Sequence, residues 1–194
     1  MSIRRILING PSGSGKTTLG RRLGEALGVP HIELDSLMHM PGWQERDPDE
    51  FRKDIAARLA AAPDGWVVDG NYTQATGSVV LGQADLVIWL RLPFARVYPA
   101  LAWRTITRAI THQELWNGNH EEWYMMFSRD SMLLWGITAW RRHHERLRER
   151  LRSERPPHVR VAIVRSRRQM DRLVLRLGAE WTMAGGARAG RRGP

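Results

Sequence analysis

Residues 10–17 read Gly-Pro-Ser-Gly-Ser-Gly-Lys-Thr, the pattern G-x-x-x-x-G-K-[ST] of a phosphate-binding loop. The glycines let the backbone curl so that N–H groups point at an anion, and the helix that follows adds positive potential. In this motif the lysine reaches the β- and γ-phosphates and the next hydroxyl binds Mg²⁺. We therefore expect ATP or another nucleoside triphosphate, with Mg²⁺, bound by Gly10, Pro11, Ser12, Gly13, Ser14, Gly15, Lys16, Thr17 and Thr18.

Asp69 follows a short apolar run, Trp66 to Val68. A carboxylate at the end of a buried strand beside the loop can bind Mg²⁺ directly or through water. The other interpretation is a simple turn at the strand end, since Asp-Gly is a common turn pair. The neighbouring loop favours the first, so we expect Thr17 and Asp69 to position the metal.

Asp35 ends another apolar run, Ile32-Glu33-Leu34-Asp35. At the carboxyl end of a strand it would face the γ-phosphate, where it could accept the proton of an attacking hydroxyl group. The alternative is that Asp35 only caps the following turn as an N-cap residue. We favour a role in the acceptor site.

Arg104 and Arg108 are four residues apart in a predicted helix and so share one face. Two guanidinium groups aimed at the transferring phosphoryl group would stabilise the charge on its oxygens in the transition state. On an ordinary surface helix the same pair would only be solvated. The candidate catalytic residues are thus Lys16, Asp35, Arg104 and Arg108.

The elements that must position these residues alternate between strands and helices. Apolar runs predict strands at residues 3–8, 31–34, 66–68, 86–92 and 159–164, and residues spaced three or four apart predict helices between and after them. Such alternation is typical of a three-layer α/β fold with a parallel sheet, whose ligands bind at the carboxyl ends of the strands. We expect one domain over residues 1–180.

The stretch between the fourth and fifth strands is unusually long, from Phe94 to Pro157. We expect a lid or helical insertion at residues 110–125, followed by a long helix to residue 152. Five of the nine tryptophans lie in this stretch, and we interpret them individually as the core of a helical subdomain, because aromatic side chains dominate burial.

The net charge of +10 is confined to one end of the chain. Residues 1–140 hold 14 Lys and Arg against 15 Asp and Glu, whereas residues 141–194 hold 16 against 5. We interpret His143, His144 and the arginines from Arg141 to Arg152 as a solvated basic helix face, with nucleic-acid contact as the alternative. The apolar stripe of this helix is expected at Trp140, His144, Leu147 and Leu151. Residues 181–194 are poor in apolar side chains, and we expect a disordered basic tail.

Composition excludes several classes of site. The chain has no cysteine, so it forms no disulfide, thiolate metal site or cysteine nucleophile. Its 42% hydrophobic and 26% charged content is typical of a globular protein. Its longest apolar stretches are too short to span a bilayer, and we expect a cytoplasmic protein without a membrane partner.

Together these segments resemble the adenylate kinase-like P-loop kinases, and more closely the small bacterial DNA topology modulation (FlaR-related) proteins. The resemblance rests on the loop and on four further segments: Leu34 to Leu37 with Pro41-Gly42-Trp43, Val68 to Tyr72, Trp103-Arg104 with Arg108, and Arg165 to Arg167. It implies a five-stranded sheet in the order 2-3-1-4-5, a helical lid, and ATP with Mg²⁺.

The chain also departs from the nucleotide-kinase pattern. Adenylate kinases follow their Asp-Gly with an aromatic residue, Pro and an Arg that holds the acceptor phosphate, but here Asn71, Tyr72 and Thr73 follow Gly70. No arginine lies between Arg22 and Arg46 either. We therefore expect an ATP-dependent small-molecule kinase whose acceptor is a hydroxyl compound rather than a nucleoside monophosphate. The alternatives are a slow NTPase and a nucleotide-gated nucleic-acid-binding protein.

Overall fold

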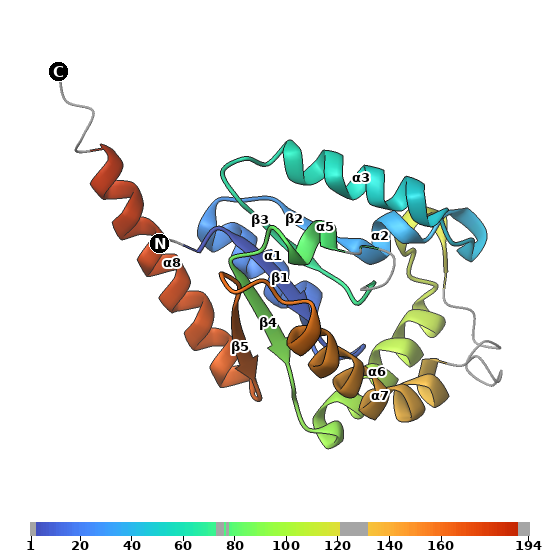
Figure 1. The fold of residues 1–194 in the computed structure, drawn as a ribbon. Helices are drawn as coiled ribbons and strands as arrows, with labels where there is room; N and C mark the ends of the chain where they lie inside the picture. The colour runs from blue at the N-terminus through green and yellow to red at the C-terminus, as the bar shows by residue number, and fades with distance from the viewer. Residues whose placement is uncertain (1–2, 73–75, 77, 121–131, 190–194) are drawn as a thin grey trace.

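The computed structural model describes residues 3–72, 76, 78–120 and 132–189. Five parallel strands form one sheet in the order β2-β3-β1-β4-β5, which confirms the expected fold class and strand order (Figure 1). The strands are β1 (Arg5–Asn9), β2 (His31–Glu33), β3 (Trp66–Asp69), β4 (Leu86–Leu90) and β5 (Arg160–Val164). Among the described helices, none combines the length and apolar character that crossing a membrane requires.

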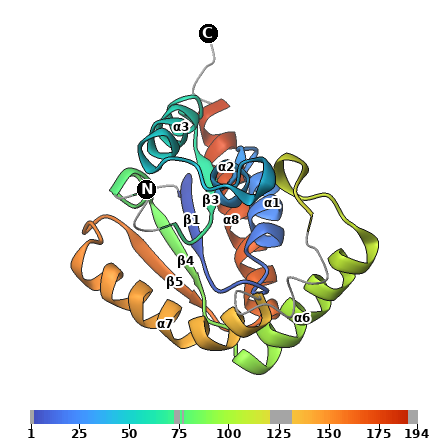
Figure 2. The ribbon, with the colours of Figure 1, turned by 90° about the vertical axis from the view of Figure 1, so that its right-hand side faces the viewer.

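Helices cover both faces of the sheet (Figure 2). On one face, α1 (Lys16–Leu27) and α8 (Arg167–Ala189) pack over the side chains of Ile6, Ile8 and Ile88. On the other, α2 (Leu34–Met38), α3 (Pro48–Ala60) and α5 (Ser78–Leu81) pack over Leu7 and Val68. Successive side chains of a strand point to opposite faces, so the strands are apolar almost throughout.

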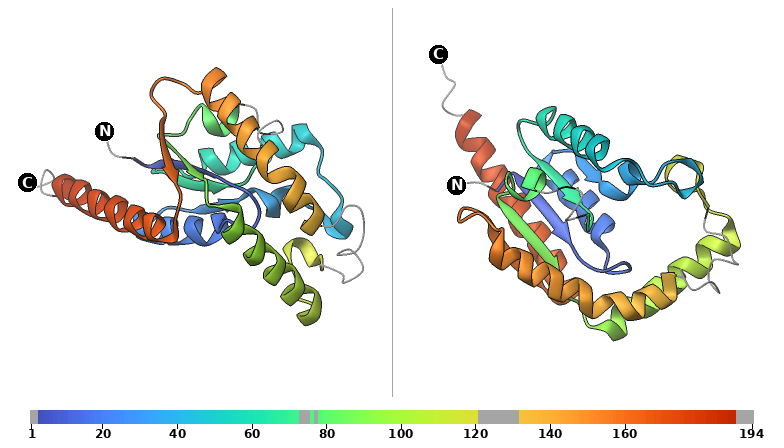
Figure 3. Two further views of the ribbon diagram at one scale, coloured as in Figure 1. Left: turned by 90° about the horizontal axis from the view of Figure 1, so that it is seen from below. Right: turned by 45° about the vertical axis from the view of Figure 1, so that its right-hand side comes forward.

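The long connection between β4 and β5 contains two helices, α6 (Phe94–Thr111) and α7 (Met132–Ser153), and a short turn, η2 (Trp116–Gly118). Helix α6 lies at the end of the sheet where the phosphate-binding loop lies, and α7 runs back from that end along the sheet toward the start of β5 (Figure 3). Part of the lid expected at 110–125, and the predicted start of the long helix, fall at residues 121–131 outside the described chain.

Two expectations about this part of the chain differ from the structure. Trp103 is 74% exposed on α6 and is therefore not part of an aromatic core. Helix α8 continues to Ala189, past residue 181, where a disordered tail was expected. The side chains of Leu173 and Leu177 anchor the preceding turns of α8 in the core, and the helix extends outward from there.

Candidate nucleotide and acceptor site

The phosphate-binding loop connects β1 to α1, as its sequence requires. Gly13 and Gly15 have φ values of 80° and 89°, a left-handed conformation that glycine adopts without strain. A Cβ atom at Gly13 would lie 2.8 Å from the carbonyl oxygen of Val97 and 2.9 Å from Cβ of Leu101. Helix α6 therefore packs directly on the loop, and the lack of a side chain at Gly13 permits this close approach.

Side-chain amides tie the start of the loop to the end of β3. Asn71 donates from Nδ2 to the carbonyl oxygen of Gly10 at 2.8 Å, and its Oδ1 accepts from the Gly10 amide at 3.2 Å. Asn9 donates to the carbonyl oxygen of Gly70 at 2.5 Å. These bonds hold the loop and the segment after β3 in one arrangement.

Lys16 is buried at the centre of a group of charges. Burial lowers the pKa of its ammonium group, and the nearby Arg104 guanidinium acts in the same direction. The carboxylates of Asp35, Asp69 and Glu33 oppose this shift. The structure thus brings Lys16, Asp35, Asp69 and Arg104, all selected from the sequence, into one electrostatic environment.

Asp69 ends β3 and has no exposed surface. Its Oδ2 atom contacts Nε2 of His31, from β2, at 2.7 Å. The two side chains lie directly against α1 at Gly20: a Cβ atom on that glycine would be only 2.3 Å from His31 Nε2. The other oxygen, Oδ1, is buried and has no hydrogen-bond partner within the described part of the chain.

Thr17, the other expected metal ligand, donates from its hydroxyl to Oε1 of Glu33 at 3.0 Å. Glu33 is the last residue of β2, so its carboxylate lies beside the same loop. Mg²⁺ prefers oxygen ligands and commonly binds one or two carboxylates together with substrate phosphates. The Thr17 hydroxyl, the Glu33 carboxylate and the unpartnered Oδ1 of Asp69 are a donor set that fits this ion.

Asp35 lies within α2 rather than at its N-cap position, which Glu33 occupies without a side-chain capping bond. The N-cap alternative is therefore wrong. Burial raises the pKa of Tyr72, and so do the charge of Asp35 and a hydrogen bond to it. The Tyr72 hydroxyl also lies 3.1 Å from Nε2 of His39. Asp35, Tyr72 and His39 thus form a polar chain beyond the carboxyl ends of β2 and β3.

The segment after α2 is held by residues from the turn that follows α6. Asn119, which is 3% exposed, donates to the carbonyl oxygen of Met40 at 2.9 Å and accepts from the Trp43 amide at 2.9 Å. Asn117 donates to the carbonyl oxygen of His39 at 2.6 Å. The insertion and the segment after α2 therefore form one wall, and we call these contacts the asparagine clasp.

Helix α6 places its two arginines differently. Arg104 lies one turn beyond Leu101, which packs on the loop, and its charge acts on Lys16. Arg108 lies one further turn along the same face. Of the expected pair, the structure thus brings Arg104 near Lys16. The catalytic role of Arg108 stays a prediction.

Helix α7 contributes His143, which the sequence indicated as part of a solvated basic face, and His144, which it also indicated as part of the apolar stripe of this helix. His144 is buried, and its Nδ1 accepts a hydrogen bond of 3.0 Å from Trp89 Nε1. His143 is half-buried, and Lys16 is near enough to lower its pKa. The apolar stripe expected at His144 is therefore confirmed, whereas the solvated face is wrong for His143, because α7 turns this side toward β4 and the loop.

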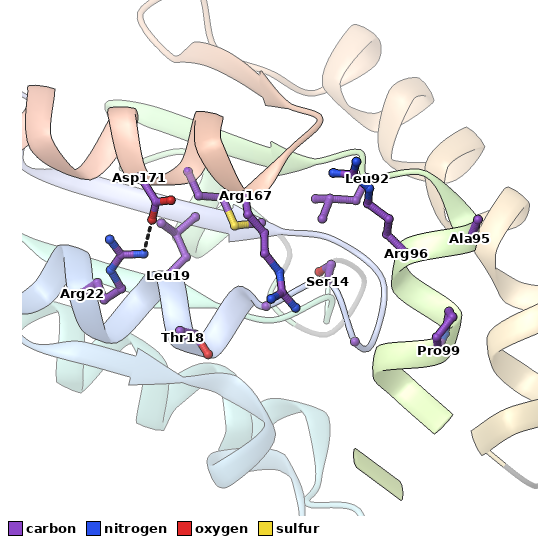
Figure 4. A pocket seen from close by; sticks show the side chains of 13 residues that line it. Ser14, Thr18, Leu19, Arg22, Leu92, Ala95, Arg96, Pro99, Arg167 and Asp171 are labelled. Atoms are coloured by element: carbon purple, nitrogen blue, oxygen red, sulfur yellow. Dashed lines mark hydrogen bonds and ion pairs between the residues drawn. The ribbon is translucent and has the colours of Figure 1, made fainter. Parts of the chain in front are cut away.

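A cavity of about 700 Å³ lies beside the phosphate-binding loop, between α1, α6 and α8 (Figure 4). Arg167 reaches from α8 toward the start of α1, and the ion pair of Arg22 with Asp171, 2.6 Å long, lies at one side. The loop residues Gly13, Ser14 and Gly15 and the exposed Thr18 also line it. Its size and place suit the base and sugar of a nucleotide.

Several residues of this site were not selected from the sequence, among them His31, Glu33 and Tyr72. The sequence did contain a signal for Glu33, which stands two residues before Asp35 at the end of the same predicted strand. A polar residue within an apolar run directly opposite the loop was a sign of function. His31 and Tyr72 carried no comparable signal, because their roles depend on contacts between strands.

Solved structures with the same fold include kinases. A gluconokinase from Sinorhizobium meliloti 1021 superposes with a TM-score of 0.50 at 20% identity, covering 98% of each chain. A shikimate kinase from Acinetobacter baumannii, in complex with shikimate, gives a TM-score of 0.52 at 18% identity over 89% of this chain and 91% of that one. At these identities the likeness concerns the fold alone.

Sequence similarity covers a shorter region. A family model described as an AAA domain matches residues 6–98. The cytidylate kinase of Nitratidesulfovibrio vulgaris (strain DP4) is 35% identical over 43 residues, 22% of this chain and 18% of that kinase. The cytidylate kinase of Methylobacterium sp. (strain 4-46) is 40% identical over 57 residues, 29% and 27% of the two chains. The matches thus span well under a third of those kinases.

The loop, the order of the strands and these similarities define the class: the chain has the fold of the P-loop small-molecule kinases. They support this broader class and do not support the narrower resemblance to DNA topology modulation proteins. The acceptor has to be argued from the residues of the site.

Proposed function

We propose that this protein transfers the γ-phosphoryl group of ATP to a hydroxyl group of a small molecule. The observation that carries the proposal is the set of charges that act on the buried Lys16: Arg104 and the carboxylates of Asp35, Asp69 and Glu33. Cations that neutralise phosphate charge and carboxylates that bind a metal or accept a proton are the parts that phosphoryl transfer uses.

In this proposal each residue has a distinct task. Lys16 and the amides of the loop bind the triphosphate, and the cavity beside the loop takes the base and sugar. Thr17, Asp69 and Glu33 would hold Mg²⁺, which would supply positive charge to neutralise the phosphates. Arg104 stabilises the transferring group, and Arg108 joins it when the insertion closes.

Asp35 is the residue that distinguishes a hydroxyl acceptor from a phosphate acceptor. A hydroxyl loses its proton as it attacks, so a carboxylate within reach is useful, whereas a phosphate acceptor needs no base. Asp35 lies beside Lys16 and hydrogen bonds with Tyr72, which orients the carboxylate. We infer that Tyr72 and His39 help to position the acceptor next to it.

The nucleotide part of the proposal is tested by Lys16→Ala. The wild-type protein should gain thermal stability with ATP and Mg²⁺, and the variant should lose that gain while keeping its fold by circular dichroism. An unchanged gain in the variant would exclude the loop as the nucleotide site.

The transfer part is tested by incubating the protein with ATP, Mg²⁺ and fractionated metabolites and searching for a phosphorylated product by mass spectrometry. Asp35→Asn should lower product formation at least about a hundredfold, the usual scale for loss of a general base. It should leave ATP binding intact. Phosphate released only to water, in wild type and variant alike, would instead indicate an NTPase.

A further inference from the structure

His144 anchors α7 to the sheet beside the nucleotide site. Its Nδ1 accepts a hydrogen bond from Trp89, near the carboxyl end of β4, and its ring packs edge-on against Trp140 at 4.7 Å between centroids. The side chain of His144 is 6% exposed. This anchor determines how α7 is rotated about its own axis.

The anchor also determines the direction of the preceding side chain, that of His143. Neighbouring residues of a helix point about 100° apart, so His143 cannot face β4 as well. Lys16 is near enough to act on it: burial, and then the Lys16 ammonium, lower the pKa of His143 to about 3. The imidazole is therefore neutral at physiological pH.

The Nε2 atom of His143 is buried and has no hydrogen-bond partner in the described part of the structure. An unpaired buried nitrogen is costly, and such atoms in folded proteins call for an explanation. The ring packs edge-on against that of His144, with 5.5 Å between the centroids, so the hydrogen bond of Nε2 is left for a ligand.

The surroundings of His143 select the ligand chemistry. Lys16 marks the position of the β- and γ-phosphates in this type of loop, and Arg104 brings a second positive charge to Lys16. Phosphoryl oxygens accept hydrogen bonds, and an imidazole N–H supplies a donor without adding a third buried cation.

We propose that His143 contacts the phosphates of the nucleotide: its Nε2–H donates a hydrogen bond to a phosphoryl oxygen beside Lys16. This inference rests on the proposed nucleotide site and adds α7 as a wall of that site. It gives the insertion a direct part in binding the donor.

The test compares two variants, His143→Leu and His143→Gln, in direct titrations with ATP and Mg²⁺ by calorimetry. Leu removes the donor, whereas the amide of Gln can place a neutral N–H near the position of Nε2. We expect the Kd for ATP to rise at least about tenfold in His143→Leu and to stay within about threefold of wild type in His143→Gln. His158→Leu is the matched control, because His158 is exposed and lies outside the site. This variant should bind ATP with the Kd of the wild type.

Two results would overturn the inference. One is ATP binding by His143→Leu that equals that of the wild type. The other is an equal loss in both variants while circular dichroism shows an intact fold, since a shape requirement would then replace the hydrogen bond. Failure of the wild-type protein to bind ATP would reject the proposed function itself, which keeps the two failures apart.

Discussion

At the scale of single residues, the contact between His31 and Asp69 depends on the absence of a side chain at Gly20. Gly20→Ala would put a Cβ atom 2.3 Å from His31 Nε2 and 3.2 Å from Asp69 Oδ2. Alanine favours a helix by about 1 kcal/mol over glycine, but forced displacement in a packed core costs about 1–3 kcal/mol. We expect a net loss in the free energy of unfolding, measured by urea denaturation.

The matched control is Gly178→Ala in α8, where the added Cβ atom would make ordinary contacts of 3.5 and 3.8 Å with Ala26. Here only the gain in helix propensity should remain, so the variant should be more stable than the wild type by up to about 1 kcal/mol. If Gly20→Ala were stabilised to the same extent, His31 would not be held against α1 as the structure shows.

Asn71 gives a second prediction at this scale, because both polar atoms of its amide bind the backbone of Gly10. Asn71→Ala should lower the free energy of unfolding by about 2 kcal/mol, since it leaves a partly buried N–H and C=O unpaired. Asn71→Asp keeps an acceptor for the Gly10 amide but has no donor, so its loss should be smaller. The midpoint of urea denaturation should therefore be highest for the wild type, lower for Asn71→Asp and lowest for Asn71→Ala. An Ala variant as stable as the wild type would contradict this prediction.

The residues of the site fall into two groups: those that a local sequence pattern marks, and those whose roles depend on contacts between distant segments. Lys16, Thr17, Asp35 and Asp69 could be selected from the sequence, because a motif or a position after an apolar run marked each of them. His31 and Gly20 could not, because their roles arise only where β2, β3 and α1 meet. A lone histidine in a short strand carries no such information by itself.

At the scale of elements, helix α7 makes the protein sensitive to acid. Burial, together with Lys16, His144 and Arg146, lowers the pKa of His143 to about 3, and burial, with Arg91 and Arg148, lowers that of His144 to about 4. Between the ordinary pKa of 6.5 and these values, the unfolded chain binds protons that the folded chain does not. Stability contributed by the neutral histidines is therefore present above pH 6.5 and declines as pH falls.

We expect His143→Gln, which cannot titrate, to show a shallower fall in melting temperature than the wild type between pH 7 and pH 4. Thermal denaturation followed by circular dichroism at half-unit steps measures the two slopes. His158→Gln, at an exposed position, should retain the wild-type slope. Identical slopes for His143→Gln and the wild type would contradict the burial of the neutral ring.

The elements themselves were largely predictable, since all five strands were marked by apolar runs and the helices by their spacing. The orientation of α7 was predictable only in part. The apolar stripe marked His144 as buried, but the bond of His144 to Trp89 on β4 and the inward position of His143 were not predicted. A pairing between residues 55 positions apart leaves no local pattern in the sequence.

At the scale of the whole molecule, the asparagine clasp joins the insertion to the segment after α2. Asn119 bonds both the carbonyl oxygen of Met40 and the amide of Trp43, while the phosphate-binding loop is held separately by Asn71. The two walls of the site are thus stabilised by different contacts. Loosening one of them should leave the other in place.

This separation leads to a prediction for Asn119→Ala. Loss of the buried amide unpairs Met40 and Trp43, so the segment 36–46 should open more often, by about tenfold or more, which corresponds to an unfavourable change of about 1.4 kcal/mol or more in local stability. Hydrogen exchange followed by mass spectrometry should show faster exchange in peptides covering residues 36–46 but not in those covering the phosphate-binding loop. Thermal stabilisation by ATP should persist.

The control is Asn117→Gly, which removes hydrogen bonds on the exposed side of the clasp. Asn117 has a φ of 57°, so glycine tolerates its backbone conformation where alanine would add strain. Water can replace the lost bonds there, so exchange of segment 36–46 should change less than in Asn119→Ala. Equal acceleration of exchange in both variants would contradict the buried role of Asn119. If exchange in the phosphate-binding loop rose together with that of segment 36–46, the two walls would instead form one cooperative unit. A change in one wall would then also alter nucleotide binding at the other.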